Sequence, residues 1–200
     1  MAAPITLAPA FRDPVRQSQS IFRAAMDALA RPGTIVSVAP ELVPPAPLLP
    51  PAAALLLTLC DFETTVWLDR PLASARAVFD FLRFHTGVRI VAASADAGYA
   101  VISDATSIPP LDAFAQGTPD YPDQSTTLII QVETLTASGW ALEGPGIRDR
   151  ICFSAGPLPG DFVAQLRANR SRFPRGVDLF FTTPTQIAAL PRSTRLTGTD

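Results

Sequence analysis

The 200-residue sequence contains no lysine, and all 16 of its basic residues are arginines. Lysine forms the Schiff base of pyridoxal phosphate enzymes, contacts phosphate in P-loop proteins and serves elsewhere as a general base. These three kinds of chemistry are therefore excluded within the chain. In particular, we expect no cofactor, because pyridoxal phosphate has no lysine with which to form an internal aldimine.

Histidine and cysteine are also scarce, with one histidine (His85) and two distant cysteines (Cys60 and Cys152). No CxxC, HxxxH or cysteine-rich spacing is present, so we expect no zinc or iron–sulfur site, and only a carboxylate-bound magnesium ion fits the composition. Two lone cysteines do not form a disulfide framework. Both lie in apolar runs, 57–60 and 151–153, which favours buried thiols and a reducing compartment.

Charge and long apolar runs are limited as well. The formal net charge is -2, which argues against nucleic acid as a partner, because binding to phosphate backbones requires a basic face. The first ten residues lack the pattern of a secretory signal. The longest apolar run, 50–57, is far shorter than the ~20 residues of a membrane helix. We expect a soluble, cytoplasmic protein without membrane contact.

What is present is an alternation of helical and extended patterns in a chain that is 48% apolar. Apolar periodicity and capping residues predict helices over 14–30, 51–60, 72–84 and 161–171. Apolar and β-branched runs predict strands over 34–38, 64–68, 88–92, 100–103, 127–132, 140–142 and 177–182, followed by a short apolar stretch at 187–190. Apart from Gln131, residues 128–132 are apolar on both parities, as in a central strand covered on both faces.

This pattern predicts an α/β fold: a single-domain three-layer sandwich with a central mixed sheet and helices on both faces. The domain spans 1–200, with an N-terminal tail at 1–12. Six prolines between Pro40 and Pro51 predict a stiff surface loop over 39–51. We find no internal repeat.

Several segments together carry a resemblance to a known family. They are Phe22-Arg23 with Pro32-Gly33, LLLTLCD at 55–61 leading into VWL at 66–68, LRFHTG at 82–87, GPGI at 144–147, FPRGVD at 173–178 and LPRST at 190–194. In this order and at these spacings, the chain resembles the PhnH family, a subunit of the carbon–phosphorus lyase core complex of bacterial phosphonate metabolism. The proline density of 40–51 exceeds that associated with the family.

The resemblance implies a subunit of a transferase complex of the ribose 1-methylphosphonate 5-triphosphate synthase type. That complex displaces the adenine of ATP with an alkylphosphonate. The resemblance also implies a homodimer, partnership with the other core subunits, and a fold similar to the large domain of pyridoxal-phosphate-dependent transferases without that cofactor. The absence of lysine agrees with the last point independently.

Arg83, His85 and Arg192 are the candidate ligand-binding residues. Arg83 can clamp a phosphonate or triphosphate through two hydrogen bonds, and histidine is the residue type that exchanges protons near neutral pH. The structural alternative places His85 at the end of helix 72–84, with its ring bonded to a terminal carbonyl. Helical residues two apart point about 200° from each other, which weakens the pairing of residues 83 and 85. We expect Arg192 to be exposed, available to a ligand or a partner.

Four arginines, Arg167, Arg170, Arg172 and Arg175, form the densest basic cluster and are the candidate partner-binding residues. Arginine without lysine suits protein interfaces, although such a run is most often a solvated helix face.

Three other features favour structural roles over chemical ones. Residues 144–146 lack the length, lysine and hydroxyl of a phosphate loop and predict a tight turn. Asp61 could hold magnesium or act as a base, but an aspartate between helix and strand is typical of a loop cap. Trp67 is expected to be a core or interface aromatic residue.

We assign no catalytic residue, because no paired carboxylates or metal ligands suited to displacement at a ribose carbon are recognisable. Two hypotheses follow. The chain is a noncatalytic assembly subunit that supports the chemistry of its partners, or it receives the phosphonate or nucleotide directly through Arg83, His85 and Arg192. The first is favoured, and we do not expect the chain to be catalytic alone.

Overall fold

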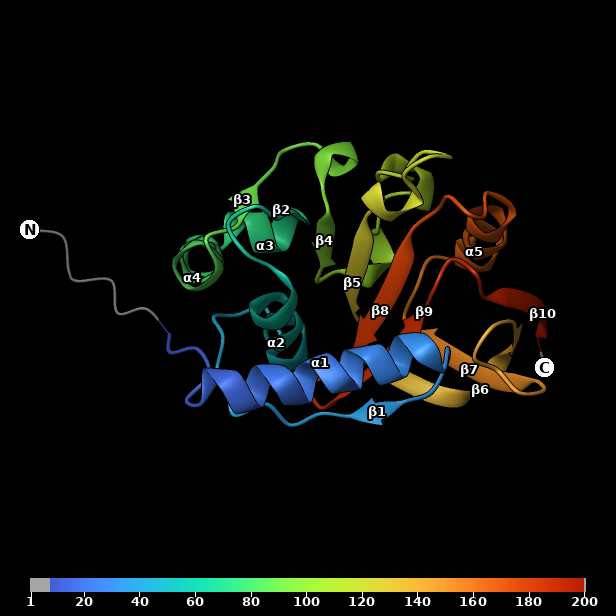
Figure 1. Ribbon diagram of the computed structural model, residues 1–200, viewed down its shortest axis with the longest axis horizontal. Helices are drawn as coiled ribbons and strands as arrows, with labels where there is room; N and C mark the ends of the chain where they lie inside the picture. Colours follow the sequence, from blue (N-terminus) through green and yellow to red (C-terminus); the bar gives the residue numbers. More distant parts are fainter. Residues whose placement is uncertain (1–7, 200) are drawn as a thin grey trace, which may run out of the picture.

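A mixed seven-stranded sheet forms the centre of the protein (Figure 1), whose computed structural model describes residues 8–199. Its order is β1-β9-β8-β5-β4-β2-β3. Strands β3, β2, β4, β5 and β8 are parallel to one another, whereas β9 runs antiparallel to β8, and β1 antiparallel to β9. The strand bounds are β1 Val36–Ser37, β2 Thr65–Leu68, β3 Arg89–Ile90, β4 Tyr99–Ile102, β5 Thr127–Gln131, β8 Asp178–Thr182 and β9 Gln186–Leu190.

A second, three-stranded antiparallel sheet has the order β10-β6-β7. Its strands are β6 Thr134–Glu143, β7 Ile151–Gly156 and β10 Arg195–Thr199. The pairing of β6 with β7 shifts register between Thr136 and Trp140, where Gly139 has a positive φ of 99°.

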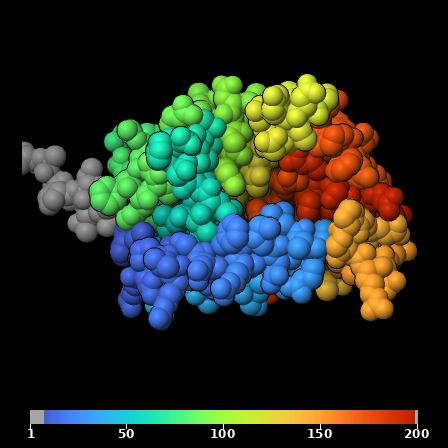
Figure 2. All heavy atoms as spheres, in the orientation of Figure 1, coloured from blue at the N-terminus to red at the C-terminus, as the bar shows by residue number. Residues whose placement is uncertain are grey.

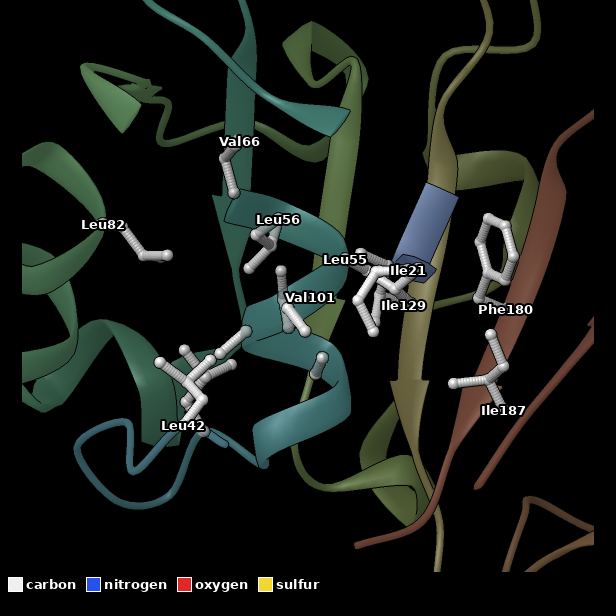
Figure 3. Close-up of a cluster of buried hydrophobic side chains, with 14 of the residues drawn as sticks. Ile21, Leu42, Leu55, Leu56, Val66, Leu82, Val101, Ile129, Phe180 and Ile187 are labelled. Atoms are coloured by element: carbon white, nitrogen blue, oxygen red, sulfur yellow. The ribbon is translucent and has the colours of Figure 1, made fainter. Parts of the chain in front are cut away.

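The helices lie on both faces of the central sheet. Their bounds are α1 Pro14–Ala30, α2 Pro50–Leu59, α3 Arg70–Ser74, α4 Arg76–Thr86 and α5 Phe162–Ser171. Helices α1, α2 and α4 pack against one face, where residues such as Leu55, Leu82 and Val101 form a buried cluster (Figure 3). The other face packs against α5 and the second sheet. The predicted α/β layering around a mixed sheet is confirmed, with a small sheet sharing one of the outer layers.

Burial on both faces of the sheet explains why alternate residues of β5 are apolar on either side of the strand. Ile129 points into the cluster beneath α1 and α2, whereas Leu128 and Ile130 point into the cluster beneath α5. All three side chains are fully buried, and β5 is the middle strand of the sheet. The predicted central strand is therefore confirmed.

Helix α1 begins as its capping signal predicts. The Asp13 carboxylate accepts a hydrogen bond from the backbone N–H of Arg16 at 3.1 Å, and Pro14 occupies the first helical turn. Ile21, Ala25 and Ala28 recur at helical spacing and are buried. Beyond the helix, Gly33 has a φ of 77°, and a Cβ there would lie 2.8 Å from the Leu142 side chain.

The predicted helix 72–84 is two helices, because the backbone breaks at Ala75. This residue has a ψ of 91° and accepts the first hydrogen bonds of α4 from Val78 and Phe79. The shorter helix, α3, has its own start signal: Asp69 caps it and Pro71 lies in its first turn. Gly87 ends α4 in the left-handed conformation, as expected.

Two segments predicted as loops are packed onto the core. The predicted tail 1–12 lies partly outside the described residues, but within its remainder Phe11 is buried. In the proline-rich segment 39–51, Leu42 and Leu48 are buried and α2 begins at Pro50. The stiff proline segment therefore covers core surface as it crosses to α2.

Candidate functional site

A cleft of about 550 Å³ lies at the carboxyl ends of the parallel strands β4, β5 and β8. In α/β proteins, ligands bind at this edge of the sheet. Loops after the three strands and the segment before α2 supply the walls. The lining residues are Pro47, Leu49, Ser103, Asp104, Ala105, Thr106, Gln131, Val132, Glu133, Pro157 and Pro184.

The charge of this cleft does not suit an anion. Its ionisable lining residues are Asp104 and Glu133, both carboxylates, and no arginine lines it. The hydroxyl of Thr106 donates to Asp104 at 2.6 Å and lowers the pKa of that carboxyl. Asp104 is thus held in its charged form, and the cleft would repel a phosphonate or a triphosphate.

Beside the cleft, the carboxylate of Asp69 joins the ends of strands β2 and β4. It accepts hydrogen bonds from the backbone N–H groups of Leu72 at 3.2 Å, Ser103 at 2.6 Å and Asp104 at 2.9 Å, and from the Ser103 hydroxyl at 3.0 Å. Sequence reasoning missed this buried residue, although an aspartate two residues before Pro71 is a helix-start signal. Its partners make it a structural tie.

Gln131, at the end of β5, anchors the proline-rich segment. Its side-chain amide donates to the carbonyl of Pro47 at 2.9 Å, and its side-chain oxygen accepts from the backbone N–H of Leu49 at 2.6 Å. The polar residue in the apolar run 128–132 therefore satisfies backbone groups that would be left unpaired before α2. It fixes one wall of the cleft.

Arg83 and His85 both lie in the last turn of α4, which runs to Thr86, and they face different neighbours. The Arg83 guanidinium stacks 5.5 Å from the Phe79 ring centroid. His85 Nε2 lies 2.9 Å from the carbonyl oxygen of Ala8, and its ring packs edge-on against Phe81 and Phe84. The His85 ring thus contacts a backbone carbonyl, as the structural alternative expected, but that carbonyl belongs to the N-terminal segment.

The expectation that Arg192 is exposed is wrong, because its side chain is 14% exposed. Its Nε and Nη2 donate to the Asp178 carboxylate, with Nη2 at 2.5 Å, and Nη2 also donates to the Ser125 hydroxyl. A further nitrogen donates to the carbonyl of Pro122. Arg192 follows β9, which lies on one side of the middle strand β5 in the sheet order. Figure 1 shows α4, which carries Arg83 and His85, near β3 on the other side of β5. The three candidate ligand-binding residues therefore do not converge on one site.

The four clustered arginines divide into two pairs. Arg167 and Arg175 are exposed, whereas Arg172 is partly buried and donates to Gln116 at 3.1 Å and Asp112 at 3.2 Å. The Arg170 guanidinium lies 4.8 Å from the Phe173 ring centroid. Arg170 and Arg172 therefore contribute to the fold at the end of α5, and Arg167 and Arg175 present the open charge.

The smaller candidates take the structural roles expected of them. Residues 144–147 form a turn in which the N–H of Ile147 donates to the carbonyl of Gly144. A Cβ at Gly146 would lie 2.0 Å from the carbonyl oxygen of Ala30, so the turn packs on the end of α1. Asp61 accepts from the Glu63 N–H and the Thr64 hydroxyl, as a loop cap does. The Thr64 hydroxyl is the main cause of its lowered pKa.

Within 8–199, no three histidine, cysteine, aspartate or glutamate side chains gather as a metal-binding set. No helix in that range has the length and apolar character needed to cross a bilayer.

Trp67 packs edge-on against Phe114 in the core beneath α5, which confirms it as a core aromatic residue.

Comparison with known proteins places the chain in a family. Residues 9–197 match the model of the bacterial phosphonate metabolism protein PhnH. The chain is 41% identical over 188 residues to the alpha-D-ribose 1-methylphosphonate 5-triphosphate synthase subunit PhnH of Rhizobium meliloti (strain 1021), covering 94% of each chain. It is 31% identical over 184 residues to HtxG of Stutzerimonas stutzeri, provisionally described as a C-P lyase subunit, covering 90% of this chain and 86% of that one. The chain therefore belongs to the PhnH family of bacterial phosphonate metabolism.

Proposed function

We propose that this chain is the PhnH subunit of a carbon–phosphorus lyase complex, in which it supports transfer of the ribose triphosphate moiety of ATP to an alkylphosphonate. Two relatives are described as subunits of this synthase or lyase, and the chain matches both along nine-tenths of its length. The other subunits of the complex are its partners.

Its role within the complex is structural. The observation that carries this proposal is the cleft at the carboxyl ends of the strands, whose ionisable lining groups are Asp104 and Glu133. Arg192, one of the candidate ligand-binding residues, is already bonded to Asp178 and Ser125. Neither feature suits a phosphonate or a nucleotide triphosphate.

A ligand-binding measurement tests the structural role. ATP and an alkylphosphonate are added separately to the purified protein, and the thermal midpoint is followed. A ligand at one hundred times its dissociation constant would stabilise the fold by about 2.7 kcal/mol. We expect no shift with either compound. A saturable shift that disappears in Arg83→Ala or His85→Ala would establish the alternative of a directly ligand-binding subunit.

Reconstitution tests membership in the complex. The remaining subunits from the same bacterium are purified and assayed for phosphonate-dependent release of adenine from ATP, with and without this chain. We expect the chain to co-elute with the other subunits and to be required for turnover. Failure to co-elute would contradict the proposed function.

We also propose that the fold is related to the large domain of pyridoxal-phosphate-dependent transferases and that it works without that cofactor. The chain has no lysine to form the internal aldimine. Protein purified in the presence of pyridoxal phosphate should be colourless after gel filtration. A stoichiometric adduct that borohydride fixes to the chain would overturn this proposal.

A homodimeric state of the isolated protein, and its location in the cytoplasm, complete the proposal. The resemblance to the family and the high apolar content support a dimer. Light scattering at micromolar concentration should return twice the chain mass of 21.3 kDa. Fractionation of the host cell should place the protein with cytoplasmic markers.

The exposed arginines of the α5 region are proposed to contact a partner subunit. Arg167→Glu and Arg175→Glu should weaken co-elution with the other subunits, because charge reversal places like charges against a surface matched to arginine. Reversal of Arg170 or Arg172 is a poorer test, since both side chains have contacts within the fold. Unchanged co-elution of both exposed variants would identify the pair as ordinary solvated groups.

A further inference from the structure

Helix α1 carries an apolar stripe on its outer surface. Val15, Phe22 and Met26 are 73%, 48% and 49% exposed, respectively. Their spacings of seven and four residues place them along one side of the helix, whereas Ile21, Ala25 and Ala28 face the core. Figure 2 shows α1, in blue, lying lengthwise along the surface of the molecule. We call Val15, Phe22 and Met26 the α1 stripe.

Part of the stripe coincides with a motif that the fold leaves unexplained. Phe22-Arg23 and Pro32-Gly33 are both among the segments that carry the family resemblance. The structure explains why residue 33 is glycine. Its positive φ disfavours other residues, and the close approach of Leu142 leaves no room for a side chain. Phe22 lies outside the two buried clusters, and the Arg23 side chain has no ion pair or hydrogen bond within the described residues.

The charges around the stripe indicate what it meets. Three neighbouring arginines each face a carboxylate of this chain: Arg12 with Glu41 at 3.9 Å, Arg16 with Asp13 at 3.6 Å and Arg31 with Asp27 at 3.1 Å. Arg23, three residues before Met26, is the arginine of α1 left without such a partner in residues 8–199. The stripe therefore presents apolar surface beside one uncompensated positive charge.

This arrangement disfavours a second copy of the chain as the occupant. The segment 12–31 contains four arginines and two aspartates. If the stripe packed on itself with two-fold symmetry, the axis would pass near residue 20. The two Arg23 side chains would then lie within about 10 Å of each other along the helix direction. Charges at that distance still repel each other in physiological salt. A surface with a carboxylate opposite Arg23 avoids that repulsion.

We propose that the α1 stripe and Arg23 form a docking surface for another subunit of the same complex, whose contacting surface is apolar and carries a carboxylate that pairs with Arg23. This inference rests on the proposed function, which supplies a multisubunit assembly. Burial of Phe22 and Met26 would provide the affinity, and the Arg23 pair would fix the orientation.

The experiment measures binding of this chain to the purified remaining subunits by biolayer interferometry. The test variants are the double variant Phe22→Ser/Met26→Ser and the single variant Arg23→Glu. Val43→Ser, which changes a side chain that is 79% exposed outside the stripe, is the apolar control. Arg76→Glu on α4 is the charge control. Thermal midpoints and circular dichroism spectra confirm that each variant is folded.

We expect the double variant and Arg23→Glu each to bind at least tenfold more weakly than the wild type, with both controls within twofold. The effect of Arg23→Glu should shrink as salt is raised. Wild-type affinity in both stripe variants would overturn the inference and leave the proposed function standing. Loss of self-association alone would also overturn it, by identifying the stripe as an interface between copies. If the wild type itself fails to bind, the proposed function is contradicted and the inference with it.

Discussion

The two ends of the central sheet place charged side chains in different ways. At the carboxyl ends, Asp69 is enclosed by backbone N–H donors, and Asp104 and Glu133 face an open cleft. At the amino ends, Arg192 and Asp178 form a pair whose side chains are 14% and 22% exposed. The first end resembles a ligand-binding edge in position but is acidic, whereas the second has the arginine but leaves it no room for a ligand.

Position and chemistry are therefore separated in this sheet. In an α/β enzyme that binds phosphates, positive or N–H groups converge at the carboxyl edge. Here the N–H groups at that edge donate to Asp69, and the buried guanidinium lies at the opposite edge. This separation supports the structural role proposed for the subunit. Within residues 8–199, the arginines without an ion pair include Arg23 on α1, Arg167 on α5 and Arg175 in the turn beyond α5.

Removal of the Asp69 carboxylate at the carboxyl end should have the largest effect on stability. Asp69→Ala leaves the N–H groups of Leu72, Ser103 and Asp104, which are buried or partly buried, without their acceptor. Because hydrogen bonds to a charged group contribute roughly 1.5–3 kcal/mol each and are not additive, we expect the free energy of unfolding to fall by about 4 kcal/mol. Urea unfolding followed by circular dichroism measures the change. A loss below about 1 kcal/mol would show that Asp69 is not a structural tie.

The matching change at the amino end is Arg192→Ala. It leaves the partly buried Asp178 carboxylate and the Ser125 hydroxyl without their donor, so we expect a loss of about 3 kcal/mol in the free energy of unfolding. Arg76→Ala is the control, because Arg76 pairs with Asp80 at 2.9 Å with its side chain 78% exposed and should cost at most ~0.5 kcal/mol. Equal effects of the two variants would contradict a buried role for Arg192.

Much of the layered α/β arrangement could be predicted, because several of its elements have sequence patterns that only one kind of structure explains. The buried strand β5 and the helix α1 were predictable, because burial on both faces and a capped amphipathic period leave distinct patterns. The break at Ala75 was not, since it depends on Asp69 and Pro71 starting a separate short helix within an apolar run. Strands β7 and β10 were missed because they pair in a small sheet whose partners are known only after folding.

The candidate site was less predictable than the fold. Whether Arg192 is exposed depends on Asp178 and Ser125, which lie 14 and 67 residues away in the sequence. Local patterns carry no information about such long-range pairs. The cleft itself is formed by loops after β4, β5 and β8, so its acidic character appears only when those strands are adjacent.

The amino end also contains two partly buried acids, Cys60 and Tyr99, whose titration affects stability at high pH. Burial raises the pKa of the Cys60 thiol from its ordinary 9.0 to about 12 and that of the Tyr99 phenol from 10.0 to about 12. The unfolded chain loses these protons first, so stability that is present below pH 9 is lost as the pH rises toward 12. The slope is about 1.4 kcal/mol per pH unit for each group that is charged only in the unfolded chain.

The measurement is urea unfolding at several pH values between 8 and 11. Cys60→Ala and Tyr99→Phe should each lose stability less steeply with pH than the wild type, although Cys60→Ala starts from a lower value because it removes a packed sulfur. Thr106→Ala, at the carboxyl end, should leave this alkaline slope unchanged. Identical slopes in all four proteins would show that neither Cys60 nor Tyr99 controls alkaline stability.

The smallest expected effect is that of His85, which lies at the end of α4 near the amino ends of the strands. His85→Ala removes its contact with the Ala8 carbonyl and part of its packing on Phe81 and Phe84, and should lower the free energy of unfolding by about 1 kcal/mol. His85→Gln, which keeps a donor, should recover part of the loss. Because the contact is structural, the reconstituted complex should retain phosphonate-dependent turnover with either variant. If His85→Ala assembles normally with the other subunits and yet abolishes turnover, His85 takes part in the reaction and the structural role proposed for this subunit is wrong.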